Sequence, residues 1–151
     1  MLAYVGIFFY LAGSLISWYF FSKPIAILSM LYLGFGDPIA SAFGIAFSTP
    51  WLRASNGKSL LGTLAATVVC TLITMACFNN PLILECGPVS NPLQWPEYVR
   101  WSVAIAGGVA AGVAELSMFG MVRDYLDDNA IIPVVSSLVL YLTTEALGHS
   151  L

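Results

Sequence analysis

A few charged residues of this sequence stand where they could do chemistry. The chain has five lysine or arginine residues and eight aspartate or glutamate residues among 151. Asp37 and Glu115 lie within long apolar runs, and Lys58 opens another such run. Asp127 and Asp128 stand together in a short polar segment. Carboxylates hold divalent cations and an amine binds phosphate oxygens, so these are the groups that phosphoryl transfer requires.

Asp37 lies between Gly36 and Pro38, inside an apolar stretch that runs from Ile25 to Phe47. An ionisable group within a membrane span costs about 2.5–3.5 kcal/mol on insertion scales, so it usually faces a cavity or a partner. We therefore predict that Asp37 is a catalytic group and a metal ligand. The alternative is a helix N-cap, because aspartate before proline is a good helix start.

Lys58, Ser59 and Thr63 open the next apolar run, where a helix should begin. The segment resembles the end of a nucleotide-binding P-loop, but Leu52 stands where that motif requires glycine, which excludes it. An amine, two hydroxyls and the amides of a helix end attract phosphate oxygens. We predict cofactor binding by Lys58, Ser59, Gly62 and Thr63. The alternative is a lysine anchor followed by a serine cap.

Acidic and amide side chains complete the set further along the chain. Glu115 lies inside a span, where a buried carboxylate needs a cation or a proton, and it is our candidate general base. A structural, hydrogen-bonding glutamate is an equally open interpretation.

Asp127, Asp128 and Asn129 are hard oxygen ligands of the kind that Mg²⁺ uses beside phosphate. We assign Asp128 to catalysis, Asp127 and Asp128 with Asp37 to the metal, and Asn129 to the nucleotide; a solvated acidic loop is the alternative.

The elements that must position these groups are membrane spans. Hydrophobic residues make up 59% of the chain and charged residues 9%, and the mean hydropathy is +0.88, so the chain lacks the polar surface of a water-soluble domain. A span needs roughly 20 residues. The runs of about that length are Met1–Phe21, Ile25–Phe47, Leu60–Phe78, Val99–Val122 and Ala130–Leu147. We predict an all-α fold, a polytopic transmembrane helical bundle of about five spans, in one membrane-embedded domain over residues 1–151.

Glycines and prolines refine this arrangement. Gly34, Gly36 and Pro38 predict that the second span is interrupted near Asp37. Gly108 and Gly112 give the fourth span a small-residue face for close helix packing. Five spans place the polar connections 48–59 and 123–129 on the side of the chain start, and the proline-rich link 79–98 on the other. The distribution of basic residues favours the first side as cytosolic.

The remaining composition excludes several classes of protein. The net charge of −3 and the lack of a basic run argue against a nucleic-acid partner. Three cysteines and a single histidine form no zinc-binding pattern.

Four ordered elements of the sequence resemble the membrane-embedded CTP-dependent lipid kinases. That group includes dolichol kinase, phytol and farnesol kinases and fungal CTP-dependent diacylglycerol kinase. The elements are Gly36-Asp37-x-x-Ala40-Ser41, Lys58-Ser59-Leu60-x-Gly62-Thr63-Leu64-Ala65, Glu115, and Asp127-Asp128-Asn129-x-x-Ile132-Pro133. The resemblance departs at Leu61, where many relatives carry an acidic residue. Relatives usually have further spans upstream, which this chain is expected to lack.

The resemblance implies transfer of the γ-phosphate of CTP to a membrane lipid alcohol (polyprenol, phytol or diacylglycerol), with Mg²⁺ or another divalent cation. It places Asp37, Lys58, Glu115, Asp128 and Asn129 among the functional positions. The expected location is the endoplasmic reticulum membrane with the motifs on the cytosolic side; a plastid membrane and a homo-oligomer stay open. The alternatives are a cytidylyltransferase that makes a CDP-lipid and a non-enzymatic transporter or membrane subunit.

Overall fold

The computed structural model describes residues 2–47, 49, 52–54, 57–80, 82–84, 91–116 and 128–151. Its regular elements are helices, and the described part adds one isolated antiparallel bridge between Arg53 and Ser59. In chain order the helices are α1 (Leu2–Phe20), α2 (Lys23–Leu31), η1 (Tyr32–Gly36), α3 (Asp37–Phe47), α4 (Leu60–Asn79), η4 (Pro92–Gln94), α5 (Glu97–Leu116) and α6 (Asp128–Ala146).

The predicted all-α polytopic bundle is confirmed. α2, η1 and α3 form one helix of 25 residues, Lys23–Phe47, which is long and apolar enough to cross a membrane. The same holds for α4, for α5 and for Asn129–Ala146 of α6. α1 contributes a shorter apolar stretch, Gly6–Phe20. The fourth predicted span reached Val122, but residues 117–127 lie outside the described ranges.

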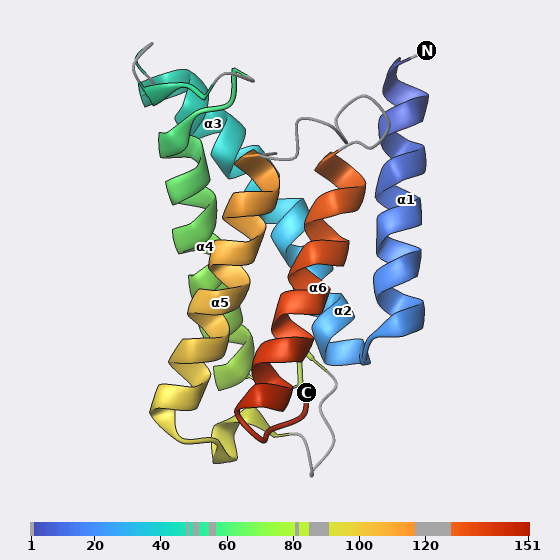
Figure 1. Cartoon of the computed structure of the whole chain (residues 1–151), viewed down its shortest axis with the longest axis vertical. Coiled ribbons are helices and arrows are strands. Elements are labelled where there is room, and N and C mark those ends of the chain that lie inside the picture. The colour runs from blue at the N-terminus through green and yellow to red at the C-terminus, as the bar shows by residue number, and fades with distance from the viewer. Residues whose placement is uncertain are drawn as a thin grey trace.

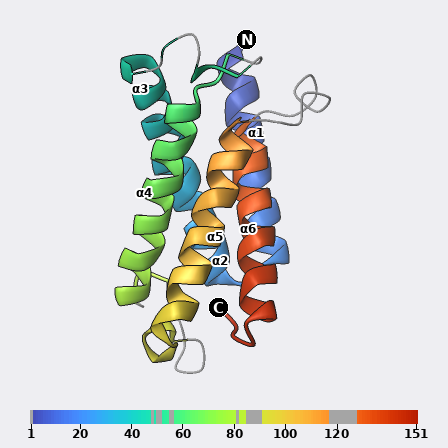
Figure 2. The same cartoon turned by 60° about the vertical axis from the view of Figure 1, so that its left-hand side comes forward.

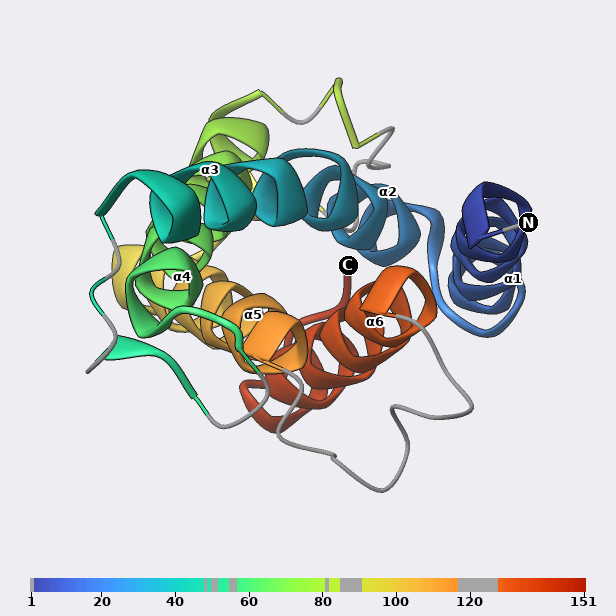
Figure 3. The same cartoon turned by 90° about the horizontal axis from the view of Figure 1, so that it is seen from above.

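The helices run alongside one another, with α4, α5 and α6 as neighbours (Figure 2). Seen from above, α1 lies at the edge of the bundle, where it packs against α6 and α2 (Figure 3). The chain start, the end of α3, the start of α4, the end of α5 and the start of α6 all lie at one end of the bundle (Figure 1). We call it the motif end, and the opposite end the far end. The helix ends that flank the connections 48–59 and 123–129 thus lie on the side of the chain start, as predicted.

The predicted interruption near Asp37 is a π-helical turn, η1, inside a continuous helix. Pro38 cannot donate a backbone hydrogen bond and its ring crowds the carbonyl four residues earlier, so a wider turn accommodates it. Asp37 itself is helical, with φ −61° and ψ −50°. The alternative that Asp37 is a helix N-cap is therefore wrong, because an N-cap residue has non-helical angles.

A buried polar contact fixes η1 against its neighbours. The Tyr32 hydroxyl is hydrogen-bonded to the Thr74 hydroxyl of α4, and both side chains are fully buried. Gly107 of α5 leaves the room for Tyr32, because a Cβ at that position would overlap the Tyr32 hydroxyl. Gly36 brings η1 close to α4 as well, since a Cβ there would lie 2.9 Å from Cys70 Sγ. The π-helical turn is thus held by both α4 and α5.

Threonines of α4 and glycines of α5 form the seam between these two helices. A Cβ on Gly108 would overlap Thr71 Oγ1, and a Cβ on Gly112 would overlap Thr67 Oγ1. The threonine hydroxyls donate within their own helix, Thr67 to Thr63 O at 2.9 Å and Thr71 to Thr67 O at 2.8 Å. The seam is therefore close-packed with its hydroxyls satisfied, as suits a membrane interior. The predicted packing role of Gly108 and Gly112 is confirmed.

Candidate functional site

A polar cavity of about 180 Å³ lies at the motif end, between α3, α4 and α5. Its walls come from three helices and from the segment that joins α3 to α4. The lining residues are Ala40, Ser41, Gly44, Ile45, Arg53, Gly57, Lys58, Ser59, Gly62, Thr63 and Glu115. Of the residues predicted to act, the cavity brings together Lys58, Ser59, Gly62, Thr63 and Glu115.

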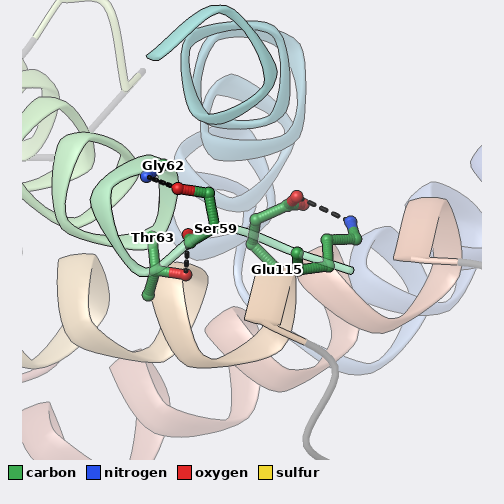
Figure 4. A network of polar contacts seen from close by, with 5 residues as sticks. Ser59, Gly62, Thr63 and Glu115 are labelled. Carbon is green, nitrogen blue, oxygen red and sulfur yellow. Dashed lines mark hydrogen bonds and ion pairs between the residues drawn. The ribbon is translucent and has the colours of Figure 1, made fainter. Parts of the chain in front are cut away.

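Lys58 and Glu115 form a direct ion pair across this cavity. Lys58 Nζ donates to Glu115 Oε1 at 2.6 Å (Figure 4). The Glu115 side chain is only 6% exposed and the Lys58 side chain 30%. A buried carboxylate is stabilised by a nearby opposite charge, and Lys58 supplies one to Glu115. The bilayer-anchor interpretation of Lys58 does not account for this pairing.

The seam between α4 and α5 explains how Lys58 and Glu115, which are 57 positions apart in the chain, come into contact. Gly112 packs on Thr67, and Glu115 lies nearly one helical turn beyond Gly112. On the antiparallel neighbour, Thr63 and then Ser59 lie one and two turns before Thr67. Because residues three and four apart share a helix face, the seam carries Glu115 to the start of α4.

The start of α4 is capped as the sequence indicated. Ser59 is the N-cap, and its hydroxyl accepts from the Gly62 amide at 3.3 Å (Figure 4). The Thr63 hydroxyl donates to the Ser59 carbonyl at 3.2 Å. Gly62 also allows α3 to approach, because a Cβ there would overlap the Ala40 carbonyl oxygen. The positive end of the α4 dipole disfavours the Lys58 amine and favours an anion. Glu115 is that anion in this structure.

The other predicted site residues are not part of the cavity wall. Asp37 is partly buried and lies one helical turn before Ser41, which lines the cavity, on the same face of α3. Asn129 is partly buried in the first turn of α6. Asp128 begins α6, but its side chain is outside the described part, and Asp127 is wholly outside it.

Of the three predicted ligands of a divalent cation, Asp37 is the one whose side chain the structure describes. Among the described residues, no three His, Cys, Asp or Glu side chains gather as a metal site. Two of the three predicted ligands, Asp127 and Asp128, contribute no described side chain. The assignment of the metal to Asp37, Asp127 and Asp128 therefore stays a prediction.

Arg53 is a cavity residue that was not predicted as part of the site. It faces Ser59 in the antiparallel bridge and lines the cavity with Lys58. A signal was present in the sequence, because Gly57 between Arg53 and Ser59 suits the left-handed position of a three-residue hairpin loop, and Ala54 and Lys58 pair around such a loop.

A second, larger hollow lies between α3 and α4. It is an apolar groove of about 460 Å³, lined by Phe43, Phe47, Leu61, Leu64, Ala65, Val68 and Val69. On each helix these residues stand beside those that line the polar cavity, so the same helix pair borders both hollows.

Comparison with known proteins found relatives among fungal lipid kinases. CTP-dependent diacylglycerol kinase 1 of Eremothecium gossypii is 34% identical over 145 residues, covering 91% of this chain and 44% of the relative. Its namesake in Saccharomyces cerevisiae is 33% identical over 144 residues, covering 91% and 48%. That of Schizosaccharomyces pombe is 33% identical over 140 residues, covering 93% and 61%. The chain thus spans about half the length of the curated relatives that it matches.

No family model and no solved structure matches the chain. The three relatives nevertheless support the resemblance to CTP-dependent lipid kinases that the four sequence elements predicted, over about nine tenths of the chain. They give no support to the cytidylyltransferase or transporter alternatives.

Proposed function

We propose that this chain, related in sequence to the CTP-dependent lipid kinases over about nine tenths of its length, transfers the γ-phosphate of CTP to a membrane lipid alcohol. The observation that carries the proposal is the polar cavity at the motif end, where an amine, two hydroxyls and a buried carboxylate lie together. The printed names of the relatives favour diacylglycerol as the acceptor.

In the proposed reaction the lipid hydroxyl oxygen attacks the γ-phosphorus of CTP. A bond forms between that oxygen and phosphorus, the bond to the β-phosphate oxygen breaks, and CDP leaves with the bonding electrons. Glu115 accepts the hydroxyl proton as general base. Lys58 lies against Glu115, so its amine can stabilise the phosphoryl oxygens beside the base. Ser59, Gly62 and Thr63 shape the anion-favouring start of α4.

The proposal includes a divalent cation that accompanies the nucleotide. Asp37, Asp127 and Asp128 are its proposed ligands, and Asn129 a nucleotide contact. When bound, such a cation neutralises charge on the phosphate oxygens. Asp37 lies one turn of α3 from the cavity, which supports its assignment.

The membrane supplies the other substrate. We propose that the apolar part of the lipid remains in the bilayer beside α3 and α4, which border both the apolar groove and the polar cavity. The proposed location is the endoplasmic reticulum, with the motif end in the cytosol where CTP is available. The positive-inside bias supports this orientation.

The test uses the purified protein in lipid nanodiscs, with CTP labelled at the γ-phosphate. Diacylglycerol, a polyprenol and phytol are offered separately, with Mg²⁺. We expect a labelled phospholipid product from one of them, with diacylglycerol first. Label released as pyrophosphate, with a CDP-lipid formed, would instead indicate a cytidylyltransferase. Folded protein that labels no lipid would refute the proposal.

A further inference from the structure

We propose that Arg53 supplies the charge that binds the polyphosphate chain of the nucleotide, while the Lys58–Glu115 pair acts on the reacting group. This inference rests on the proposed function and assigns a separate role within the same cavity. It divides binding from catalysis between two basic residues that are only five positions apart in the chain.

A small hairpin positions Arg53. The backbone of Ala54 donates to Lys58 O at 2.8 Å, and Gly57 donates to Ala54 O at 2.9 Å. Gly57 has φ +83°, a conformation that a side chain would strain, so glycine suits this turn. The antiparallel bridge sets Arg53 directly opposite Ser59.

Residues directly opposite in an antiparallel pair project from the same face of the ribbon. Arg53 therefore projects toward the side of Ser59, the N-cap of α4, and both residues line the cavity. The guanidinium is placed at the positive end of a 20-residue helix, where an anion is favoured.

The charges of the cavity point to the same division. Lys58 is paired with Glu115, so these two charges largely offset each other. In the described part of the chain, Arg53 has no carboxylate within ion-pair distance, and its side chain is exposed. Among the described lining residues, Arg53 therefore adds a positive charge that the Lys58–Glu115 pair does not offset, beside the positive end of α4. A polyphosphate is the ligand that this charge favours.

Arginine also differs from lysine in its geometry. A guanidinium stays charged under all physiological conditions, and its planar fork can bind two phosphate oxygens at once. An exposed guanidinium at the mouth can engage successive phosphates of the chain without disturbing the buried pair. Arg53 should accordingly govern nucleotide affinity, and Lys58 with Glu115 should govern turnover.

The experiment compares Arg53→Gln and Arg53→Lys with the control Arg100→Gln in nanodisc-embedded protein. Arg100 is the matched control because it is an arginine of the far end, where Nη1 donates to Asn79 Oδ1 at 3.1 Å. Binding of CTP, CMP and inorganic tripolyphosphate is measured by calorimetry, and KM and kcat for CTP are measured in the lipid assay.

We expect Arg53→Gln to weaken CTP and tripolyphosphate binding by about 10- to 100-fold, as for a lost charge-assisted contact. CMP binding should weaken less, because CMP has one phosphate. KM for CTP should rise while kcat stays within about threefold, and Arg53→Lys should fall between Arg53→Gln and the wild type. Arg100→Gln should bind as the wild type does, and the thermal midpoint of Arg53→Gln should be unchanged because its side chain is exposed.

Two other results overturn the inference in distinguishable ways. If the wild type binds CTP and Arg53→Gln binds it equally well, Arg53 has no such role and the proposed function stands. If the wild type binds neither CTP nor tripolyphosphate, the proposed function fails, and the role of Arg53 fails with it.

Discussion

At the far end of the bundle the chain closes over the helices with aromatic and apolar side chains, whereas at the motif end it leaves a charged cavity. Trp95 follows the short helix η4 and packs edge-on against Phe78 and against His149, with ring centroids 5.6 and 5.1 Å apart. Leu84 and Leu151 are buried in the same cluster. The motif end instead buries Glu115 and pairs it with Lys58.

This difference separates stability from function. Packed aromatic groups stabilise a fold through burial, while a buried ion pair is weak evidence for stability because desolvation offsets its attraction. The proposed function gives a reason for the cost of burying Glu115 at the motif end. We expect far-end substitutions to change the free energy of unfolding, and motif-end substitutions to change binding and turnover.

Trp95→Ala should have the largest effect on stability. Truncating a buried tryptophan typically costs about 3–5 kcal/mol, because it leaves a cavity. Denaturant or thermal unfolding in detergent measures the loss. The control Tyr98→Ala, at a neighbouring aromatic that is 68% exposed, should change stability by no more than about 0.5 kcal/mol.

The same Trp95→Ala protein, assayed below its unfolding transition, should keep its affinity for CTP. A large loss of affinity in the folded fraction would contradict the separation of the two ends.

Gly62→Ala should lower stability less than Trp95→Ala does, and it should change the geometry of the motif end. A Cβ at Gly62 would overlap the Ala40 carbonyl oxygen, so α3 and α4 must move apart at the cavity. We expect a loss of about 1–3 kcal/mol, as for other overpacked sites, and at least a tenfold loss of phosphoryl transfer.

Gly34→Ala is the matched control for Gly62→Ala. A Cβ at Gly34 would meet no atom within 4 Å, so stability and activity should stay near those of the wild type. Equal behaviour of the two alanine variants would show that the contact between α3 and α4 does not shape the cavity.

The sequence predicted the membrane spans well because length and apolarity alone decide which segments can cross a bilayer. The packing face at Gly108 and Gly112 was predictable for a similar local reason. The nature of the interruption near Asp37 was not predictable. Glycines and a proline permit either a broken helix or a π-helical turn, and the contacts of Tyr32 and Gly36 with other helices accompany the observed turn.

Of the predicted residues, Lys58, Ser59, Gly62, Thr63 and Glu115 line the cavity, but their contacts were not predicted. Lys58 and Glu115 were singled out separately, as a phosphate ligand and a general base. Their pairing depends on the register of α4 against α5, which the fit of threonines to glycines fixes and which no local pattern reveals. Arg53 was missed because it was counted only among the basic residues that set the membrane orientation, although Gly57 suits the three-residue hairpin loop that places it.

The central claim is that the charged pair of the motif end performs phosphoryl transfer. Its most direct test is the rate of labelled lipid formation by the double variant Lys58→Met with Glu115→Gln, beside that of Arg100→Gln. The double variant removes both charges of the pair together, so neither Lys58 nor Glu115 is left as a charge without the other. We predict that the double variant loses at least about 100-fold in rate while Arg100→Gln stays within about twofold of the wild type. A double variant that phosphorylates lipid at the wild-type rate would contradict the account.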